Sequence, residues 1–201
     1  MYKIITILLF FFTLTQNIQA NYFIAVDIPK EVEHKLDQVK KKLAQQLYGK
    51  FEEKEKFHIT LKFLGKLSKN EALLAQNQLK NILKKRCQFK IFVKNLGFFP
   101  NIKRARVVWL GIQSKELNEL GKLINHNIKE FKEDAYKFNP HITLARLSCT
   151  HPSWLLKKFQ TEINSKKILT KFIVTKIFLL KSNQGKYFKI TSFPLKNKNS
   201  W

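Results

Sequence analysis

The tetrapeptide His58-Ile59-Thr60-Leu61 occurs a second time, unchanged, as His141-Ile142-Thr143-Leu144. Each copy lies in a β-prone run of residues, 57–64 and 137–146, that is typical of a strand. Side chains alternate along a strand, so the histidine and threonine of each copy face one side while the isoleucine and leucine face the other. The repeat therefore predicts two equivalent strands, each anchored in the core and each presenting a histidine and a threonine to a shared cleft.

Two such pairs suit acid–base chemistry on a phosphodiester. Imidazole titrates near neutral pH, so one ring can accept a proton while its twin donates one. We therefore identify His58 and His141 as the candidate acid–base pair. The hydroxyls of Thr60 and Thr143 can donate hydrogen bonds to phosphate oxygens. For a single copy, a histidine hydrogen-bonded within a sheet is the alternative, and the repeat argues against it.

A metal centre is a rival interpretation of the two histidines. Zinc needs three or four protein ligands, and no carboxylate stands at ligand spacing from either tetrapeptide. Cys87 and Cys149 are too few and too far apart in sequence for a disulfide scaffold or a thiolate site. We therefore expect no metal and no other cofactor.

The composition points to a folded, strongly basic protein. The 201 residues are 44% hydrophobic and 13% aromatic, which suffices for one sizeable core. Lysine and arginine number 38 against 14 acidic residues, giving a formal net charge of +24. Such a charge favours binding to polyanions such as nucleic acid. The alternative is a biased composition that leaves a lysine-rich surface without a dedicated partner.

Hydrophobic periodicity predicts strands interleaved with helices. The first half is predicted to contain strands at 22–26 and 57–64, a helix at 30–47, and a helix at 68–85 that a Ser68/Glu71 capping box opens. The second half is predicted to contain strands at 88–95, 104–113 and 137–146, helices at 115–131 and 153–159, a β-prone run at 168–180, and a hairpin strand at 186–191. Because these runs are not spaced as regular βαβ units, they favour an α+β fold with two antiparallel sheets flanked by helices.

The N-terminus has the three-part form of a secretory signal peptide. Lys3 precedes the apolar stretch 4–14, which is too short to span a bilayer, and a polar stretch follows up to Ala20. The alternative is an extension translated from a misplaced start, although Met1 is the only methionine. We expect a leader at 1–20, a single domain at 21–195 and a frayed tail at 196–201.

The chain resembles the two-histidine phosphoesterases with paired His-x-Thr-x motifs, and specifically their bacterial and archaeal RNA 2′,3′-cyclic phosphodiesterases. The resemblance extends over nearly everything after Asn21. Besides the two tetrapeptides and their flanks (57–65 and 140–146), it is carried by Tyr22-Phe23-Ile24-Ala25-Val26-Asp27-Ile28-Pro29, Leu96-Gly97-Phe98-Phe99-Pro100, Val108-Trp109-Leu110-Gly111, and Ser182 with Gly185 and Tyr187. It implies a bilobal α+β fold with pseudo-two-fold symmetry and a central cleft.

The resemblance also implies roles for individual residues. His58 would be the proton donor to the leaving oxygen and His141 the base for water, with a 2′-phosphate as product. Arg146 follows the second motif where the family places a basic residue, which implies phosphate binding. Tyr187 matches a recurring aromatic residue of the family, and its role, ligand stacking or core packing, stays open.

The implied partner is RNA with a 2′,3′-cyclic phosphate terminus, bound by a monomer without a stable protein partner. The leader departs from the family pattern, because members usually begin at the first strand and act in the cytoplasm. If residues 1–20 are cleaved, we expect a periplasmic or extracellular protein, and otherwise a cytoplasmic one.

Two alternatives for the function remain open from the sequence. Paired His-x-Thr chemistry also serves 2′-5′ linkages, small cyclic nucleotides and the reverse joining of RNA ends, as in a 2′-5′ RNA ligase. A different class is a non-catalytic RNA-binding module, which would show salt-dependent binding without turnover.

We predict that the protein recovered from its native host begins at Asn21, because a signal peptidase would cleave after Ala20. Intact mass spectrometry measures this directly. Full-length protein in the cytosolic fraction would rule out the predicted export.

Overall fold

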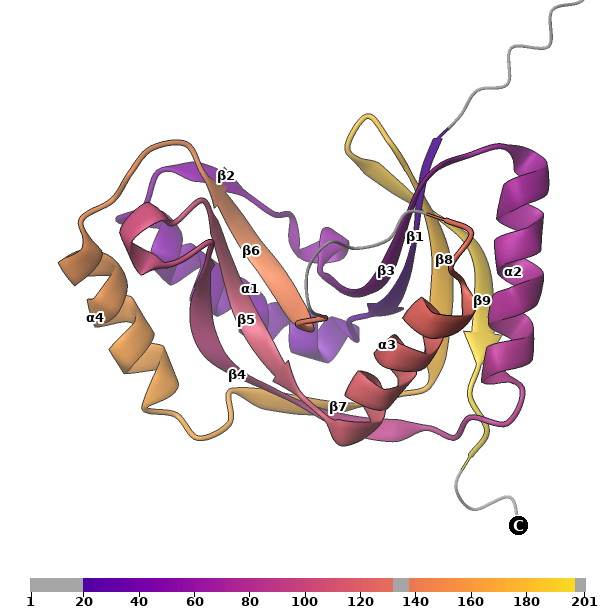
Figure 1. Cartoon of the computed structure of the whole chain (residues 1–201). Helices are drawn as coiled ribbons and strands as arrows, with labels where there is room; N and C mark the ends of the chain where they lie inside the picture. Colours follow the sequence, from indigo (N-terminus) through magenta and orange to yellow (C-terminus); the bar gives the residue numbers. More distant parts are fainter. Residues whose placement is uncertain (1–19, 132–137, 198–201) are drawn as a thin grey trace, which may run out of the picture.

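The strands of the chain join into one nine-stranded antiparallel sheet with helices against it (Figure 1). The computed structural model describes residues 20–131 and 138–197, and all of the following elements belong to that part of the chain. The strands are β1 (Ala20–Asp27), β2 (Gly49–Phe51), β3 (His58–Leu67), β4 (Phe89–Phe99), β5 (Val107–Gln113), β6 (His141–Leu147), β7 (Thr170–Val174), β8 (Lys176–Asn183) and β9 (Lys186–Pro194). The helices are α1 (Lys30–Ala44), α2 (Lys69–Leu83), α3 (Lys115–Asn127) and α4 (Ser153–Asn164), with short 3₁₀ turns η1 (Lys54–Lys56) and η2 (Ile102–Arg104). The predicted α+β class is confirmed.

One residue pair joins the two parts of the sheet. The strands run in the order β7-β4-β5-β6-β3-β1-β8-β9, with β2 paired to β6. Between β3 and β6 the register contains the single pair Ile59 and Ile142, whereas the other neighbouring strands pair over several residues. Two sheets were expected, and this pair links them into one continuous sheet that is sharply bent between two lobes.

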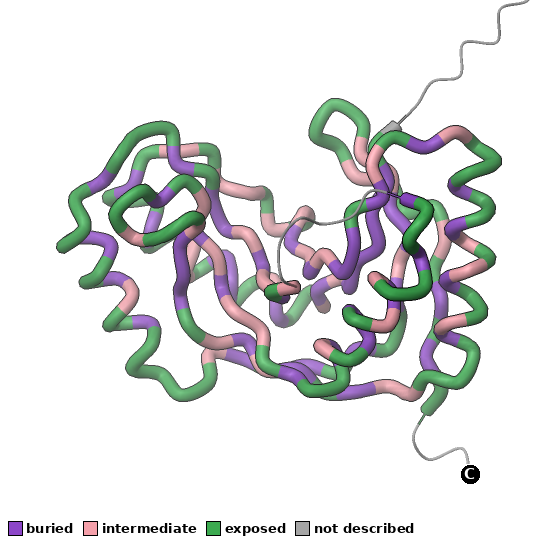
Figure 2. The backbone as a smooth tube through the Cα atoms, viewed as in Figure 1, coloured by how far each residue is buried: buried purple, intermediate pink, exposed green. Residues whose placement is uncertain are grey.

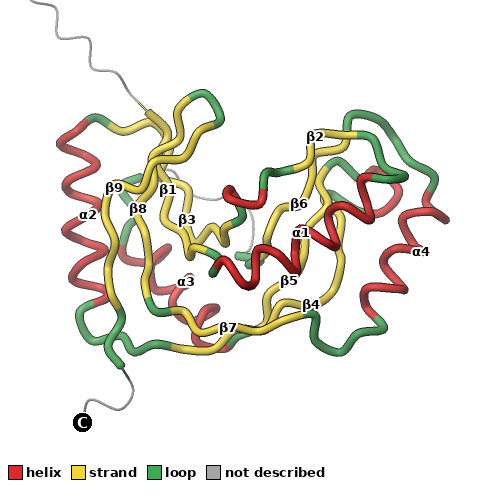
Figure 3. The backbone as a smooth tube through the Cα atoms, turned by 180° about the vertical axis from the view of Figure 1, so that it is seen from behind, coloured by secondary structure: helices red, strands yellow, loops and turns green. Residues whose placement is uncertain are grey.

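Each lobe takes elements from both halves of the chain. The first lobe contains β1, β3, β8 and β9 with helices α2 and α3, and the second contains β2, β4, β5 and β6 with α1 and α4 (Figure 1). Helix α1 follows a strand of the first lobe and yet lies across the second, as the view from behind shows (Figure 3). The two lobes therefore cannot fold as independent halves of the sequence.

Local sequence signals explain where the helices begin and which face they bury. The Ser68 hydroxyl accepts from the Glu71 backbone N–H, and the Glu71 carboxylate accepts from the Ser68 N–H, so the predicted capping box opens α2. In α1 the stripe that includes Val32, Leu36 and Leu43 is buried, as its spacing predicts. Buried segments follow the strands and the inner helix faces (Figure 2).

The β-prone run 168–180 is two strands rather than one. β7 pairs with β4 of the second lobe, and β8 pairs with β1 of the first, so the break at Thr175 marks the passage between lobes. Strand β2 was not predicted, because three residues are too few to show a period.

The predicted tail from residue 196 is corrected at its start. The Lys196 N–H donates to the carbonyl of Arg86 at 2.9 Å, and the Lys196 carbonyl accepts from the Gln88 N–H at 2.8 Å. Residues 198–201 lie outside the described part, as do residues 1–19 of the predicted leader. Within the described part, no helix has the length and apolar character needed to cross a membrane.

We predict that Ile142→Ala lowers the free energy of unfolding by about 2–5 kcal/mol, because it opens a cavity at the junction of the two lobes. Ile142 is fully buried, whereas Ile190 on β9 is 44% exposed, and Ile190→Ala should change stability by less than about 0.5 kcal/mol. Denaturant unfolding followed by fluorescence measures both. Equal costs for the two variants would contradict the structural importance assigned to the junction.

Candidate active site

A cleft of about 640 Å³ lies between the two lobes. It is lined by both tetrapeptide strands and by residues of β1, β8 and β9 on one side and of β4, β5 and the β2–η1 connection on the other. The lining residues are Asn21, Tyr22, Phe23, Glu52, Lys56, His58, Thr60, Phe63, Gly65, Phe99, Val107, His141, Thr143, Arg146, Ser182 and Tyr187. All five residues predicted to act on the substrate are among them, so the structure brings the whole candidate site together.

The junction of the sheet orients the two motifs toward this cleft. Ile59 and Ile142 are fully buried, while the histidine and threonine on either side of each line the cleft, as strand alternation predicts. Continuing the antiparallel register by one residue in each direction places His58 opposite Thr143 and Thr60 opposite His141. The site is therefore pseudo-symmetric about the isoleucine pair.

The same hydrogen bond fixes the tautomer of both rings. His58 Nδ1 lies 2.8 Å from the carbonyl oxygen of Lys56, and His141 Nδ1 lies 2.7 Å from that of Asn139. A carbonyl oxygen only accepts, so Nδ1 donates in both cases. The Nε2 atom of each ring is then the nitrogen that can exchange a proton with a ligand.

Two aromatic rings hold the imidazole of His58. The centroids of Phe23 and Tyr187 each lie 5.1 Å from that of His58, and the Tyr187 ring meets it nearly edge-on at 85°. Tyr187, whose role the sequence left open, therefore packs beside His58 in the wall of the cleft. Burial raises the pKa of Tyr187, so its hydroxyl remains protonated near neutral pH.

A matching pair of rings holds His141. The centroid of Phe99 lies 5.0 Å from that of His141 at 81°, and the Trp109 centroid lies 6.0 Å away. Trp109 in turn stacks on Phe99, with centroids 4.9 Å apart. Gly97 makes room for this arrangement, because a Cβ there would lie 2.2 Å from the Trp109 ring. Any side chain at this position would displace the rings that orient His141.

The electrostatic surroundings of His58 contain opposing contributions. Burial lowers the pKa of its imidazole, and the positive charge that His141 can carry lowers it further. The Lys56 carbonyl and the carboxylates of Glu52 and Asp27 act in the opposite direction, because they favour the protonated ring. Two carboxylates therefore partly offset the effect of burial on this histidine.

The surroundings of His141 have the opposite charge. Burial again lowers the pKa, and the Asn139 carbonyl partly opposes it. The charged group that acts on this ring is the Arg146 guanidinium, which favours the neutral imidazole. Two rings that match in hydrogen bonding and aromatic packing thus differ in their neighbouring charges.

The three residues predicted to bind phosphate all line the cleft. The Arg146 side chain is 64% exposed, and its Nε atom lies 3.9 Å from the Glu52 carboxylate. The Thr60 and Thr143 side chains also line the cleft. Together these three residues could present hydroxyl and guanidinium donors to a bound phosphate.

Sequence reasoning assigned no role to several residues around the two histidines. Phe23, Phe99 and Trp109 belong to the stretches that carried the family resemblance, which was the signal available for them. Glu52 gave no signal, because it stands in a run of alternating acidic and basic residues that predicts only a solvated loop.

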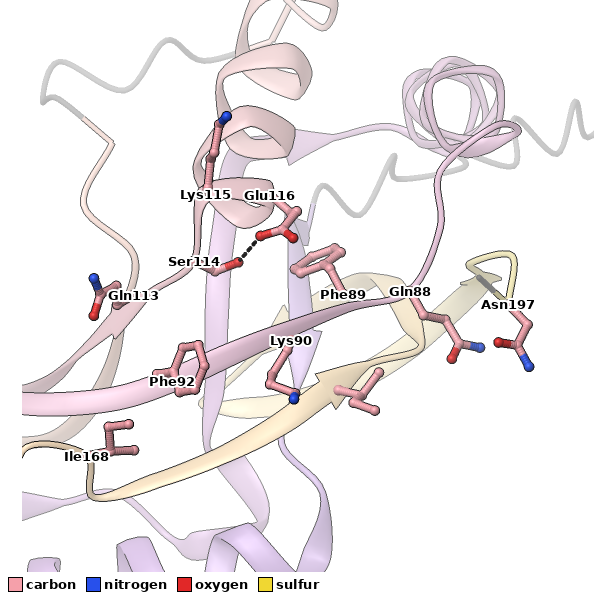
Figure 4. A pocket seen from close by; sticks show the side chains of 11 residues that line it. Gln88, Phe89, Lys90, Phe92, Gln113, Ser114, Lys115, Glu116, Ile168 and Asn197 are labelled. Carbon is pink, nitrogen blue, oxygen red and sulfur yellow. Dashed lines mark hydrogen bonds between the residues drawn. The ribbon is translucent and has the colours of Figure 1, made fainter. Parts of the chain in front are cut away.

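A larger hollow, of about 820 Å³, lies apart from the histidines, beside the start of α3 (Figure 4). Its lining contains apolar side chains such as Phe92 and Ile168, together with Ser114, whose hydroxyl donates to Glu116 at 3.2 Å. It has neither a histidine nor an arginine among its described lining residues. We therefore place the chemistry in the smaller histidine cleft.

The possible metal ligands of residues 20–131 and 138–197 are histidine, cysteine, aspartate and glutamate side chains. This part of the chain has no group of three or more histidine, cysteine, aspartate or glutamate side chains that could hold a metal ion. Among the described residues, His58 and His141 therefore belong to no such group.

The chain is similar in sequence to known proteins. Residues 26–109 match the family model described as LigT like Phosphoesterase. The RNA 2′,3′-cyclic phosphodiesterase of Aquifex aeolicus is 31% identical over 147 residues, which cover 69% of this chain and 78% of the relative. The protein of the same name from Archaeoglobus fulgidus is 30% identical over 146 residues, covering 70% of this chain and 81% of the relative.

Solved structures share the fold. A Thermus thermophilus protein superposes with a TM-score of 0.74 at 20% identity, covering 89% of this chain and 100% of the other. LigT of E. coli, crystallised in complex with 3′-AMP, superposes with a TM-score of 0.69 at 21% identity, covering 88% of this chain and 98% of the other. The resemblance inferred from the paired motifs is thereby confirmed: the chain belongs to the LigT-like family of two-histidine phosphoesterases.

Proposed function

We propose that this protein hydrolyses 2′,3′-cyclic phosphate ends of RNA to 2′-phosphomonoesters. The observation that carries the proposal is the placement of His58 and His141 in one cleft, with Nδ1 of each bound to a carbonyl and Nε2 left for proton transfer. The naming of the Aquifex and Archaeoglobus relatives as RNA 2′,3′-cyclic phosphodiesterases supports this substrate. So does the complex of E. coli LigT with 3′-AMP, a nucleotide monophosphate.

In the proposed reaction the two histidines move one proton each. Neutral His141 takes a proton from water as its oxygen attacks phosphorus, and protonated His58 gives a proton to the 3′ oxygen as the P–O3′ bond breaks. The phosphate remains on the 2′ oxygen. Exchange of both rings with solvent then restores the starting state.

The charges around the rings support this division of roles. The carboxylates near His58 favour its protonated form, which a donor needs, and Arg146 near His141 favours the neutral form, which a base needs. Reversing the roles would place the carboxylates beside the base and the guanidinium beside the acid.

The remaining cleft groups would hold the phosphate. Thr60 and Thr143 would donate hydroxyl hydrogen bonds from opposite sides, and Arg146 would add a charge-assisted contact. Two imidazoles supply both proton transfers, so this mechanism requires no metal ion. We further propose that the enzyme acts as a monomer. If the leader at 1–20 is cleaved, we propose that it acts in the periplasm or outside the cell.

The net charge of +24 favours an RNA strand over a free mononucleotide as the ligand, because lysines distributed over the surface attract a polyanion. The same charge is compatible with the alternative of a non-catalytic RNA-binding module. That alternative gives no reason for two histidine–threonine pairs aimed at one cleft.

We predict turnover of an RNA oligonucleotide that ends in a 2′,3′-cyclic phosphate, with a 2′-phosphate product, in buffer containing a chelator. Chromatography and phosphorus NMR identify the product. In the same assay, 2′-5′-linked oligonucleotides, a cyclic mononucleotide, and RNA ends offered for joining test the related activities. A preference for one of these would change the substrate, metal-dependent turnover would overturn the mechanism, and binding without any turnover would establish the RNA-binding alternative.

We predict that His58→Ala and His141→Ala each lower kcat/KM by at least roughly a hundredfold, since acid or base assistance is worth about 10² to 10⁴ in rate. Thr60→Ala and Thr143→Ala should cost less, about 1.5–3 kcal/mol for a lost hydrogen bond to a charged acceptor. His34 and His126 are exposed and lie outside the cleft, so His34→Ala and His126→Ala serve as controls. A folded His58 or His141 variant with full activity would remove that residue from the mechanism.

A further inference from the structure

Glu52 is a carboxylate in a cleft that we propose binds phosphate. Its backbone is held firmly: its N–H donates to the Leu144 carbonyl of β6 at 2.9 Å, and its carbonyl accepts from the Lys40 ammonium at 3.0 Å. Its side chain is only 16% exposed and lines the cleft. A negative charge here repels a phosphate, so its presence calls for a compensating function.

Stability alone does not account for this placement. The carboxylate is paired with Arg146 at 3.9 Å, a long contact to a side chain that is 64% exposed. Ion pairs of this kind contribute little to folding, typically between 0 and about 1 kcal/mol. By contrast, the electrostatic effect of Glu52 reaches into the cleft, where it acts on His58 and on Tyr187.

Several charged or titratable groups face His58 from the elements around it. They are Asp27 at the end of β1, Lys56 of η1, His141 and Arg146 of β6, Tyr187 of β9, and Glu52. Asp27 is already paired with the ammonium of Lys189. Of the two carboxylates that favour protonated His58, Glu52 has the larger effect.

We propose that Glu52 makes the two histidines unequal: lining the same cleft as His58, its carboxylate favours the proton-donating state of that ring, while Arg146 favours the proton-accepting state of His141. This inference rests on the proposed function, from which the roles of donor and acceptor come. In this proposal Glu52 acts through His58, so it is a positioning residue. The near-symmetric geometry makes either histidine a candidate for proton donor or proton acceptor. The charge of Glu52 near His58 and the charge of Arg146 near His141 then distinguish the two rings.

The direct test is Glu52→Gln, which removes the charge and keeps the shape. Proton NMR of the imidazole rings, without RNA, should show the titration of His58 falling by about 0.5 pH unit or more, with that of His141 moving less. His58→Gln and His141→Gln assign the resonances. A fall of less than about 0.3 unit for His58 would overturn the proposal.

The pH profile of kcat/KM on RNA with a cyclic phosphate end gives a second readout. Its alkaline limb reports loss of the proton from the donor and its acid limb reports protonation of the base. Because Glu52→Gln makes His58 lose its proton more readily, the alkaline limb should move to lower pH while the acid limb changes less. Movement of the acid limb alone would contradict the proposal.

Two controls separate charge from shape. Glu55 is a neighbouring carboxylate with a side chain that is 66% exposed and lies outside the cleft, so Glu55→Gln should leave both limbs in place. Glu52→Asp keeps the charge, so the pH at which His58 titrates should stay close to that of the unaltered protein. If Glu52→Asp lowered the pH of the His58 titration as far as Glu52→Gln does, packing rather than charge would be responsible and the proposal would fail.

The proposed function and the proposed role of Glu52 can fail separately. If the unaltered protein does not turn over cyclic-phosphate RNA, the proposed function fails, while the NMR titration still decides whether Glu52 controls His58. If Glu52→Gln does not fold, the same titration of Glu52→Ser provides an uncharged variant, with the same threshold for rejection.

Discussion

The pairing of Ile59 with Ile142 is the constraint on which the rest of the structure depends. It is the register pair that joins the two halves of the sheet, and both side chains are fully buried. In a strand, burial of one residue turns its neighbours to the opposite face. Burying this pair therefore aims two histidines and two threonines into one cleft, and it couples the packing of the core to the geometry of the site.

Ordering the histidines has an electrostatic cost. Phe23 and Tyr187 on one side, and Phe99 and Trp109 on the other, restrict the imidazole rings and keep water away from them. Loss of water disfavours the charged form and lowers the pKa of both rings. A nearby negative charge opposes this effect for His58, which is a physical reason for a carboxylate among groups proposed to bind phosphate.

The charge of the protein acts over two distances. The excess of lysine gives a long-range attraction for polyanions that does not depend on any single residue and weakens with salt. Within the cleft, individual groups matter instead: Arg146 can make directed contacts with a phosphate, whereas the Glu52 carboxylate repels one. The distributed lysines therefore attract polyanions at long range, and the residues of the cleft make the individual contacts with a ligand.

The repeated tetrapeptide by itself predicted that two histidines and two threonines share one cleft, because a period of two is a local property of a strand. The spacing of strand and helix runs predicted the α+β class. The capping box that opens α2 was likewise predictable from the sequence. Only the tertiary structure decided that one pair of isoleucines joins the sheets, that α1 crosses to the second lobe, and that the run 168–180 divides at Thr175. It alone placed Glu52 beside the histidines, since that proximity depends on the β2–β6 pairing, a contact between residues nearly a hundred positions apart that leaves no local pattern in the sequence.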